Sequence, residues 1–374
     1  MSDEVHEVKQ DDARAWCVLA GCFGSAMLVF GTISSMGVYF IDIRDEFNAT
    51  EQDVLLIVGL PMIMSTLIGP LASFAYGTLG ASVLTTVGGV CTCVALCTQM
   101  FATELWHAAV LQATVGVGCG LLIVPQYTAQ AENFDRHRRL ALGIVTIGGP
   151  LGLMLLSPLC AWLNELYTWR GAMFIMGGIA LHHVPVGLMM RLNTRTQQRA
   201  VNTKTTVKDF LDVKMLRDPS LLGMILTIVL FYSHVVIYLG MITALVVQHG
   251  LTKTAGATIL SVTGACNFGG RVLAVAMAAG NFLNGTILMG LSSFMIGFGL
   301  LGAPQIAGRI AEHHSIELTF SLSAALTVAC GLCYVVVSVV LWRTKRNTRT
   351  TSQKEQQQND EIEMSTLKRA HSDE

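Results

Sequence analysis

The chain has 374 residues and a formal net charge of −1, with 52 % hydrophobic and 13 % charged residues. Soluble domains carry roughly 25 % charged residues, so the composition excludes an ordinary soluble globular protein, and nothing in the charge balance calls for nucleic acid as a partner. Several uncharged runs reach about 20 residues, enough to cross a hydrocarbon core about 30 Å thick. Because the runs are continuous and do not alternate, we expect an all-α membrane protein in contact with the lipid bilayer and not a barrel.

Ten membrane spans are predicted along the chain. They cover, to within a few residues, 15–41, 53–74, 79–101, 105–128, 140–163, 171–191, 220–247, 255–279, 281–302 and 318–342. Ahead of the second span, Thr50 and Asp53 have the spacing of a helix N-cap and its third helical residue. Asn48-Ala49-Thr50 is also a glycosylation sequon in the predicted outside loop. The N-cap is the preferred interpretation, because the sequon lies so close to both spans.

Basic residues set the predicted orientation. Arg136, Arg138 and Arg139 follow the fourth span, further bases follow the sixth and the last, and the alternate loops are poor in them. Basic loops stay in the cytosol, and the number of spans is even, so we expect a multi-pass membrane protein with both termini cytosolic. The predicted organisation is a cytosolic N-terminal tail (1–14), a six-helix half (15–191), a cytosolic central loop (192–219), a half with about four spans (220–342) and a disordered cytosolic tail (343–374).

The fifth and sixth spans carry residues that bear on packing. The stretch GGPLG (148–152) offers a small-residue face for close helix contact. Pro150 and Pro158 predict a bent fifth span. His182 and His183 in the sixth span are expected to hydrogen-bond between helices, with a proton relay as the alternative.

Motifs for chemistry are missing from the sequence. It contains no phosphate-binding GxxxxGK, no zinc-binding HExxH and no pair of acids at catalytic spacing. The ten cysteines lie in apolar segments without nearby metal ligands, where they are expected to pack as small apolar residues. We therefore expect no enzyme activity, no metal and no cofactor.

Arg271 is the only Lys, Arg, Asp or Glu in the interior of a predicted span. A charge at mid-bilayer costs a few kcal/mol, so this arginine is either structural and reaches toward the interface, or it faces a wet cavity and binds an anion. Asn267 lies four residues earlier and therefore shares its helix face. We favour the anion site. Arg138 and Arg139 are interpreted as orientation determinants, with a cytosolic gate as the alternative role.

Three stretches resemble motifs of the monocarboxylate transporter family, within the major facilitator superfamily. DDARAW (11–16) is similar to the family's opening motif, and NFDRHRRLALGIVTIGGPLG (133–152) is similar to its second signature. NFGGR (267–271) falls on its functional eighth span. The resemblance covers most of residues 12–342, and the second signature is its most specific part.

The resemblance implies two six-helix halves around a central site with alternating access, and carboxylate transport with the span-eight arginine binding the anion. In proton-coupled members an acid precedes that arginine by four residues and a lysine lies in the first span. Asn267 and Ser34 stand at those positions here. We therefore expect Arg271, Asn267 and Ser34 to bind a monocarboxylate, a related organic anion or an amino acid, without proton coupling. A single-span ancillary subunit is a candidate partner.

The chain departs from the twelve-span pattern after the ninth span. The resemblance runs through residues 281–301 and resumes at 302–320 with the end of the eleventh span, so span ten and most of span eleven have no counterpart. We expect a major-facilitator-type bundle of about ten helices, six plus four, incomplete relative to twelve. The alternative function is a truncated, non-transporting isoform that acts as a membrane interaction or regulatory protein.

Overall fold

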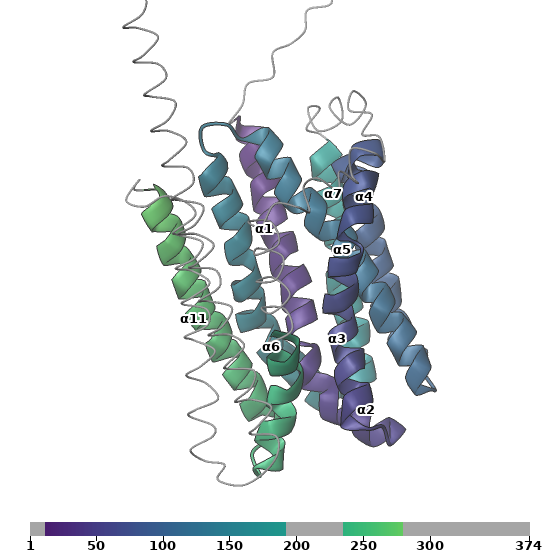
Figure 1. Cartoon of the computed structure of the whole chain (residues 1–374). Helices are drawn as coiled ribbons and strands as arrows, with labels where there is room; N and C mark the ends of the chain where they lie inside the picture. The colour runs from purple at the N-terminus through teal and green to yellow at the C-terminus, as the bar shows by residue number, and fades with distance from the viewer. Residues whose placement is uncertain (1–11, 192–234, 280–374) are drawn as a thin grey trace, which may run out of the picture.

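The computed structural model describes residues 12–191 and 235–279. All the regular secondary structure within these residues is helical. The elements are α1 (Ala13–Ser34), η1 (Met36–Tyr39), α2 (Phe40–Phe47), α3 (Glu51–Leu67), α4 (Gly69–Thr98), η2 (Gln99–Phe101), α5 (Leu105–Asn133), α6 (Arg138–Ala180), α7 (His183–Arg191) and α11 (Lys253–Ala279). A further apolar helix covers Val235–Gln248. They form one elongated bundle (Figure 1), in which α6 packs along both α1 and α11, and α5 packs along α3 and α4. The predicted all-α bundle is confirmed.

Four helical stretches of the described residues are long and apolar enough to cross a membrane. They are Ala13–Phe47, Gly69–Phe101, Leu105–Asn133 and Arg138–Arg191. On the part of α4 after Gly80, large apolar side chains recur at helical spacing and stay exposed, namely Val83, Val87, Val90 and Val94. An exposed apolar stripe of this length is unusual for a protein surface in water and fits contact with lipid.

The predicted span over 53–74 is wrong as a single helix. Instead, α3 ends at Leu67 and α4 begins at Gly69, with Pro70 in its first turn. Proline has no backbone N–H to donate, so it is accommodated at the start of a helix and disfavoured in its interior. Pro70 therefore lies at the start of a new helix, and the predicted second span is divided at Ile68.

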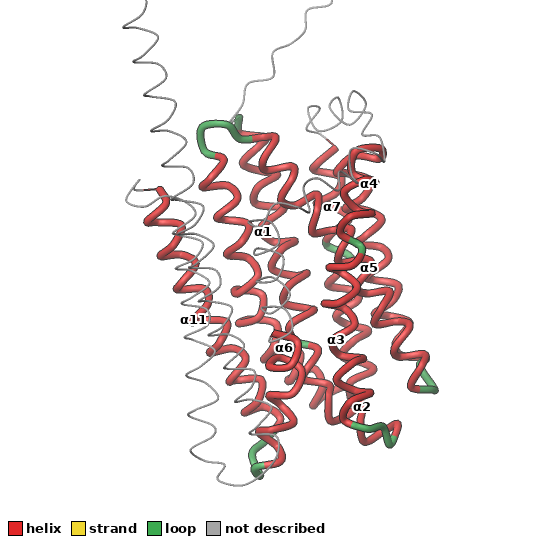
Figure 2. The backbone as a smooth tube through the Cα atoms, viewed as in Figure 1, coloured by secondary structure: helices red, strands yellow, loops and turns green. Residues whose placement is uncertain are grey.

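Two single residues interrupt the longest helices, where the sequence predicted loops of several residues. Gly80 divides α4 at φ 78°, and Thr168 divides α6 at φ 62°. The first break uses a glycine, which adopts positive φ without steric cost. The helical parts of α6 on either side of Thr168 correspond to the predicted fifth and sixth spans. Figure 2 shows how short the remaining loops are.

The start of α3 confirms the predicted N-cap. The Thr50 hydroxyl accepts a hydrogen bond from the Asp53 backbone N–H at 3.3 Å and donates one to the Asp53 carboxylate at 2.6 Å. Asn48 ends α2 in the left-handed region, and its side chain is exposed. Glycosylation at this asparagine stays a prediction.

Glycines bring α1 and α6 into close contact. A Cβ added at Gly152 would lie 2.0 Å from the Met27 carbonyl oxygen, and one at Gly31 would lie 2.8 Å from the Gly152 carbonyl oxygen. Only a residue without a side chain fits such an approach. The close contact predicted for the stretch 148–152 is confirmed.

Part of the predicted organisation lies outside the described residues. This applies to the central loop (192–219), the start of the seventh span, the ninth and tenth spans, the gap after residue 301 and the C-terminal tail (343–374).

Candidate functional site

A cavity of about 200 Å³ lies between the helices. The described residues that line it are Phe30, Ser34, Met62, Tyr127, Thr146, Gly149, Pro150, Leu153, Val235, Tyr238, Leu239, Thr263, Asn267 and Arg271. They come from α1, α3, α5, α6, the helix Val235–Gln248 and α11, and so from both predicted halves. The volume falls below the roughly 300–1,000 Å³ typical of drug-sized ligands and suits a small organic ion.

The structure brings the three predicted substrate residues to this one cavity. Ser34 is buried at the last position of α1, while Asn267 and Arg271 are half-buried on one face of α11. Among the described lining residues, Arg271 is the only charged one. The cavity is therefore a mainly neutral space with one fixed positive charge.

Two oxygen atoms from different helices orient the guanidinium group. Arg271 Nε donates to Asn267 Oδ1 at 3.1 Å, within α11. Arg271 Nη1 donates to the carbonyl oxygen of Thr146, on α6, at 3.0 Å. Two acceptors at separate nitrogens restrict the rotation of the planar group, and a planar fork of donors held in this way suits a carboxylate.

The Thr146 carbonyl is available because of the proline four residues later. In an α-helix the carbonyl of residue 146 would accept from the N–H of residue 150, and Pro150 has no N–H. The same relation recurs at Pro158, which leaves the carbonyl of Met154 without its helical donor. Ser261 of α11 donates to that carbonyl at 2.6 Å. Both prolines of α6 thus create acceptors that α11 uses.

The rest of the wall is apolar and aromatic with a few hydroxyl groups. The Tyr238 and Thr263 hydroxyls lie 2.8 Å apart and hydrogen-bond to each other across two helices. Phe30, Met62 and Leu153 contribute apolar surface. The chemistry of this lining is suited to a ligand whose charged end lies at Arg271 and whose body lies against apolar side chains.

Other residues singled out by the sequence lie away from the cavity lining. Arg138 and Arg139 are exposed at the start of α6, and their gate role stays a prediction. His183 is buried, and its Nδ1 lies 2.8 Å from the Ser25 hydroxyl of α1, which confirms the expected hydrogen bond between helices for this residue. The same expectation is wrong for His182, which is exposed and whose Nδ1 contacts the backbone carbonyl oxygen three residues earlier. No group of metal-ligating side chains occurs within the part of the chain that the structure describes.

These features define a multi-pass helical membrane protein whose helices enclose a cavity with one charged side chain among its described lining residues. The sequence profile of the Major Facilitator Superfamily matches residues 21–288, which is more than half of the chain. The chain belongs to this superfamily. Its fold is similar to that of the xylose transporter XylE from E. coli in a partially occluded inward-open conformation, with a TM-score of 0.56 and 13 % identity over 88 % of each chain.

Within the superfamily, the chain is similar to curated monocarboxylate transporters. It is 30 % identical to monocarboxylate transporter 11 of Mus musculus over 182 residues, 48 % of this chain and 41 % of that protein. It is 28 % identical to monocarboxylate transporter 13 of Rattus norvegicus over 199 residues, 53 % of this chain and 46 % of that protein. These matches span less than half the length of either relative. The resemblance drawn from the sequence motifs is confirmed, and membrane transport is the activity of the class.

Proposed function

We propose that the chain is a carrier of small organic anions of the monocarboxylate type, working by alternating access between its two halves. The observation that carries the proposal is the position of Arg271, the one charged side chain among the described residues around a cavity that both predicted halves line. A carboxylate there gains paired charge-assisted hydrogen bonds. The names of the curated relatives support the same substrate class.

We further propose that transport is not coupled to protons. Asn267 occupies the position one helical turn before Arg271, and its amide oxygen accepts from the guanidinium without titrating. Ser34 lies in the same lining with a neutral hydroxyl. No carboxylate occurs among the described lining residues to take up a proton beside the arginine.

The protein reconstituted into lipid vesicles tests both parts. We expect uptake of radiolabelled lactate, pyruvate or tryptophan down its own concentration gradient. An inward proton gradient should change the uptake rate by no more than about twofold and should leave the final level unchanged. Accumulation above the outside concentration when only a proton gradient is imposed would refute the uncoupled mechanism. Absence of uptake for every small carboxylate tried would favour the non-transporting membrane protein.

We also propose that the protein lies in the plasma membrane with both termini in the cytosol, and that a single-span ancillary subunit is a partner. The orientation rests on the basic loops, including Arg136, Arg138 and Arg139. The six-plus-four organisation likewise remains a proposal, since residues 280–374 lie outside the described residues.

The proline-created acceptor gives a prediction about affinity. In Pro150→Ala the restored N–H competes with Arg271 for the Thr146 carbonyl, so one of the contacts that orient the guanidinium is weakened. A hydrogen bond of this kind contributes about 1 kcal/mol net, and we expect roughly fivefold weaker binding of the transported carboxylate in a scintillation proximity assay.

Pro158→Ala is the matched control for that variant. It makes the same chemical change in the same helix, but the carbonyl concerned, that of Met154, serves Ser261 outside the cavity lining. The control should bind as tightly as the unaltered protein. Equal loss of affinity in the two variants would show that the straightening of α6, and not the acceptor, is responsible.

A further inference from the structure

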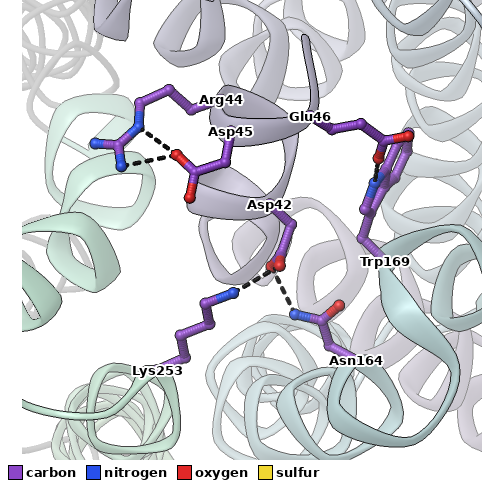
Figure 3. A network of polar contacts seen from close by, with 7 residues as sticks. All are labelled: Asp42, Arg44, Asp45, Glu46, Asn164, Trp169 and Lys253. Atoms are coloured by element: carbon purple, nitrogen blue, oxygen red, sulfur yellow. Dashed lines mark hydrogen bonds and ion pairs between the residues drawn. The ribbon is translucent and has the colours of Figure 1, made fainter. Parts of the chain in front are cut away.

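A cluster of polar contacts joins α2, α6 and α11 (Figure 3), near the end of the bundle at which Figure 1 shows α2. Lys253 Nζ, at the first residue of α11, lies 2.6 Å from Asp42 Oδ1 on α2. Asn164 on α6 donates to the other oxygen of the same carboxylate at 2.8 Å. Beside them, the Thr254 hydroxyl donates to Glu165 Oε1 at 2.6 Å. One carboxylate, Asp42, thus connects the start of α11 to two helices of the predicted N-terminal half.

This cluster lies far from Arg271 along α11. Lys253 precedes Arg271 by 18 residues, which in an α-helix is roughly 27 Å. Asp42 similarly follows Ser34, the cavity residue of α1, by eight residues. The contacts therefore close one end of the interface between the predicted halves, and the cavity lies deeper in the bundle.

Between the cluster and the cavity, the two predicted halves are in close contact. A Cβ added at Gly37 of η1 would lie 1.9 Å from the Leu239 carbonyl oxygen, and one at Gly59 of α3 would lie 2.9 Å from Val236 Cγ1. Met36 and Tyr39, on either side of Gly37, are fully buried. No passage for a substrate fits between described helices whose backbones are this close, so this part of the interface between α3, η1 and the helix Val235–Gln248 is closed in the present conformation.

The ion pair itself is only partly shielded from solvent. The Lys253 side chain is 38 % exposed and the Asp42 side chain 22 % exposed. Water screens such a pair, which makes it weaker than a buried one. A contact of this strength can hold a conformation and still break at a rate compatible with a transport cycle, whereas a fully buried pair would have to be desolvated again on every return.

We propose that Asp42 and Lys253 form a latch, assisted by Asn164 and by the Glu165–Thr254 hydrogen bond, that holds this end of the cavity closed. The latch must open whenever the site around Arg271 faces that side. Its strength sets the ratio of the closed to the open conformation, because an interaction present in only one of two states shifts their populations by its own free energy. The latch rests on the proposed alternating access between the two halves, but its test measures a conformational ratio and requires no transport.

Distances between spin labels across the latch test it directly. Gln52→Cys and Leu251→Cys place labels on exposed positions of α3 and of the turn before α11, in a protein whose ten native cysteines have been replaced. We expect Asp42→Asn and Lys253→Gln each to raise the ratio of long to short distances between the labels about two- to fivefold in double electron–electron resonance. Asp42→Lys should raise it further, and Asp42→Lys with Lys253→Asp should return it toward the starting value.

Asp45→Asn is the matched control. Asp45 is also an acid of α2 in an ion pair, at 2.9 Å from Arg44, but its partner lies on the same helix. Its loss should leave the distance ratio unchanged. A second label pair at Gln52→Cys and Met100→Cys, within the predicted N-terminal half, should keep its distance in every variant and so separates opening from unfolding. An unchanged ratio in Asp42→Asn and Asp42→Lys, or no recovery in the exchanged pair, would overturn the latch.

Discussion

Arg271→Ala is expected to reduce carboxylate transport by about thirtyfold or more. The change removes the only charge among the described lining residues of the cavity, so an entering carboxylate would lose its hydration without gaining a cation. Removal of one partner of a desolvated, hydrogen-bonded charge pair costs roughly 2–5 kcal/mol, and each 1.4 kcal/mol is a factor of about ten in affinity. The measurement is the initial rate of uptake into vesicles at several substrate concentrations.

Two variants make that result specific. Arg271→Lys keeps the charge but loses the planar fork of donors, so it should transport with weakened affinity and stand between the alanine variant and the unaltered protein. Arg14→Ala removes an equal charge from an exposed position near the start of α1, outside the cavity lining, and should transport normally. Full activity in Arg271→Ala would place the anion site elsewhere in the chain.

The residues that the sequence could predict are those whose relation is local. Asn267 and Arg271 are four residues apart, and helical periodicity alone puts them on one face. A lone charge such as Arg271 in an apolar run costs free energy in the membrane, and this cost indicates a functional or structural role. The small-residue stretch 148–152 and the N-cap at Thr50 are likewise encoded within a few residues. Ser34 is predicted as a site residue only from the family resemblance, and it lines the cavity.

The contacts that the sequence did not predict join distant segments. The sequence predicts that Pro150 and Pro158 bend the helix. It does not predict that α11 lies against α6 and donates to the two carbonyls that these prolines leave without a helical donor. Nothing in the sequence alone paired Asp42 with Lys253, which lies 211 residues away in the chain. A rule does emerge for similar chains: the carbonyl four residues before a membrane-span proline is a candidate partner for a polar residue on a neighbouring helix.

The contacts made by the proline-freed carbonyls and by the Asp42–Lys253 pair both involve α11. This helix therefore connects the cavity at Arg271 to the polar cluster at Lys253. Near Lys253 the helix is joined to α2 and α6 by side chains that carry charge, and at Arg271 it is joined to α6 by a backbone carbonyl. A carboxylate bound at Arg271 would compete for the donors that now contact Thr146. Substrate binding would then change one of the contacts between the predicted halves while the latch holds the other.

Gly152→Ala is expected to destabilise the bundle, and Gly152→Val to prevent its folding. The added Cβ would lie 2.0 Å from the Met27 carbonyl oxygen, and α1 would have to move away from α6 along a contact that also includes Gly31 and Gly148. Overpacking of this kind costs about 1–3 kcal/mol for one methyl group, and a branched side chain adds more. The measurement is the temperature at which the detergent-solubilised protein loses its monodisperse peak in size-exclusion chromatography.

Gly178→Ala provides the comparison on the same helix. Nothing lies within 4 Å of a Cβ added at Gly178, so the alanine meets no neighbour and gains up to about 1 kcal/mol of helix propensity. The protein should then lose its peak at the same temperature as the unaltered chain, or at a higher one, while Gly152→Ala loses it at a lower one. Equal unfolding temperatures for the two alanine variants would mean that α1 and α6 do not depend on this close approach, and the small-residue face would lose its role in holding α6 where it meets Arg271.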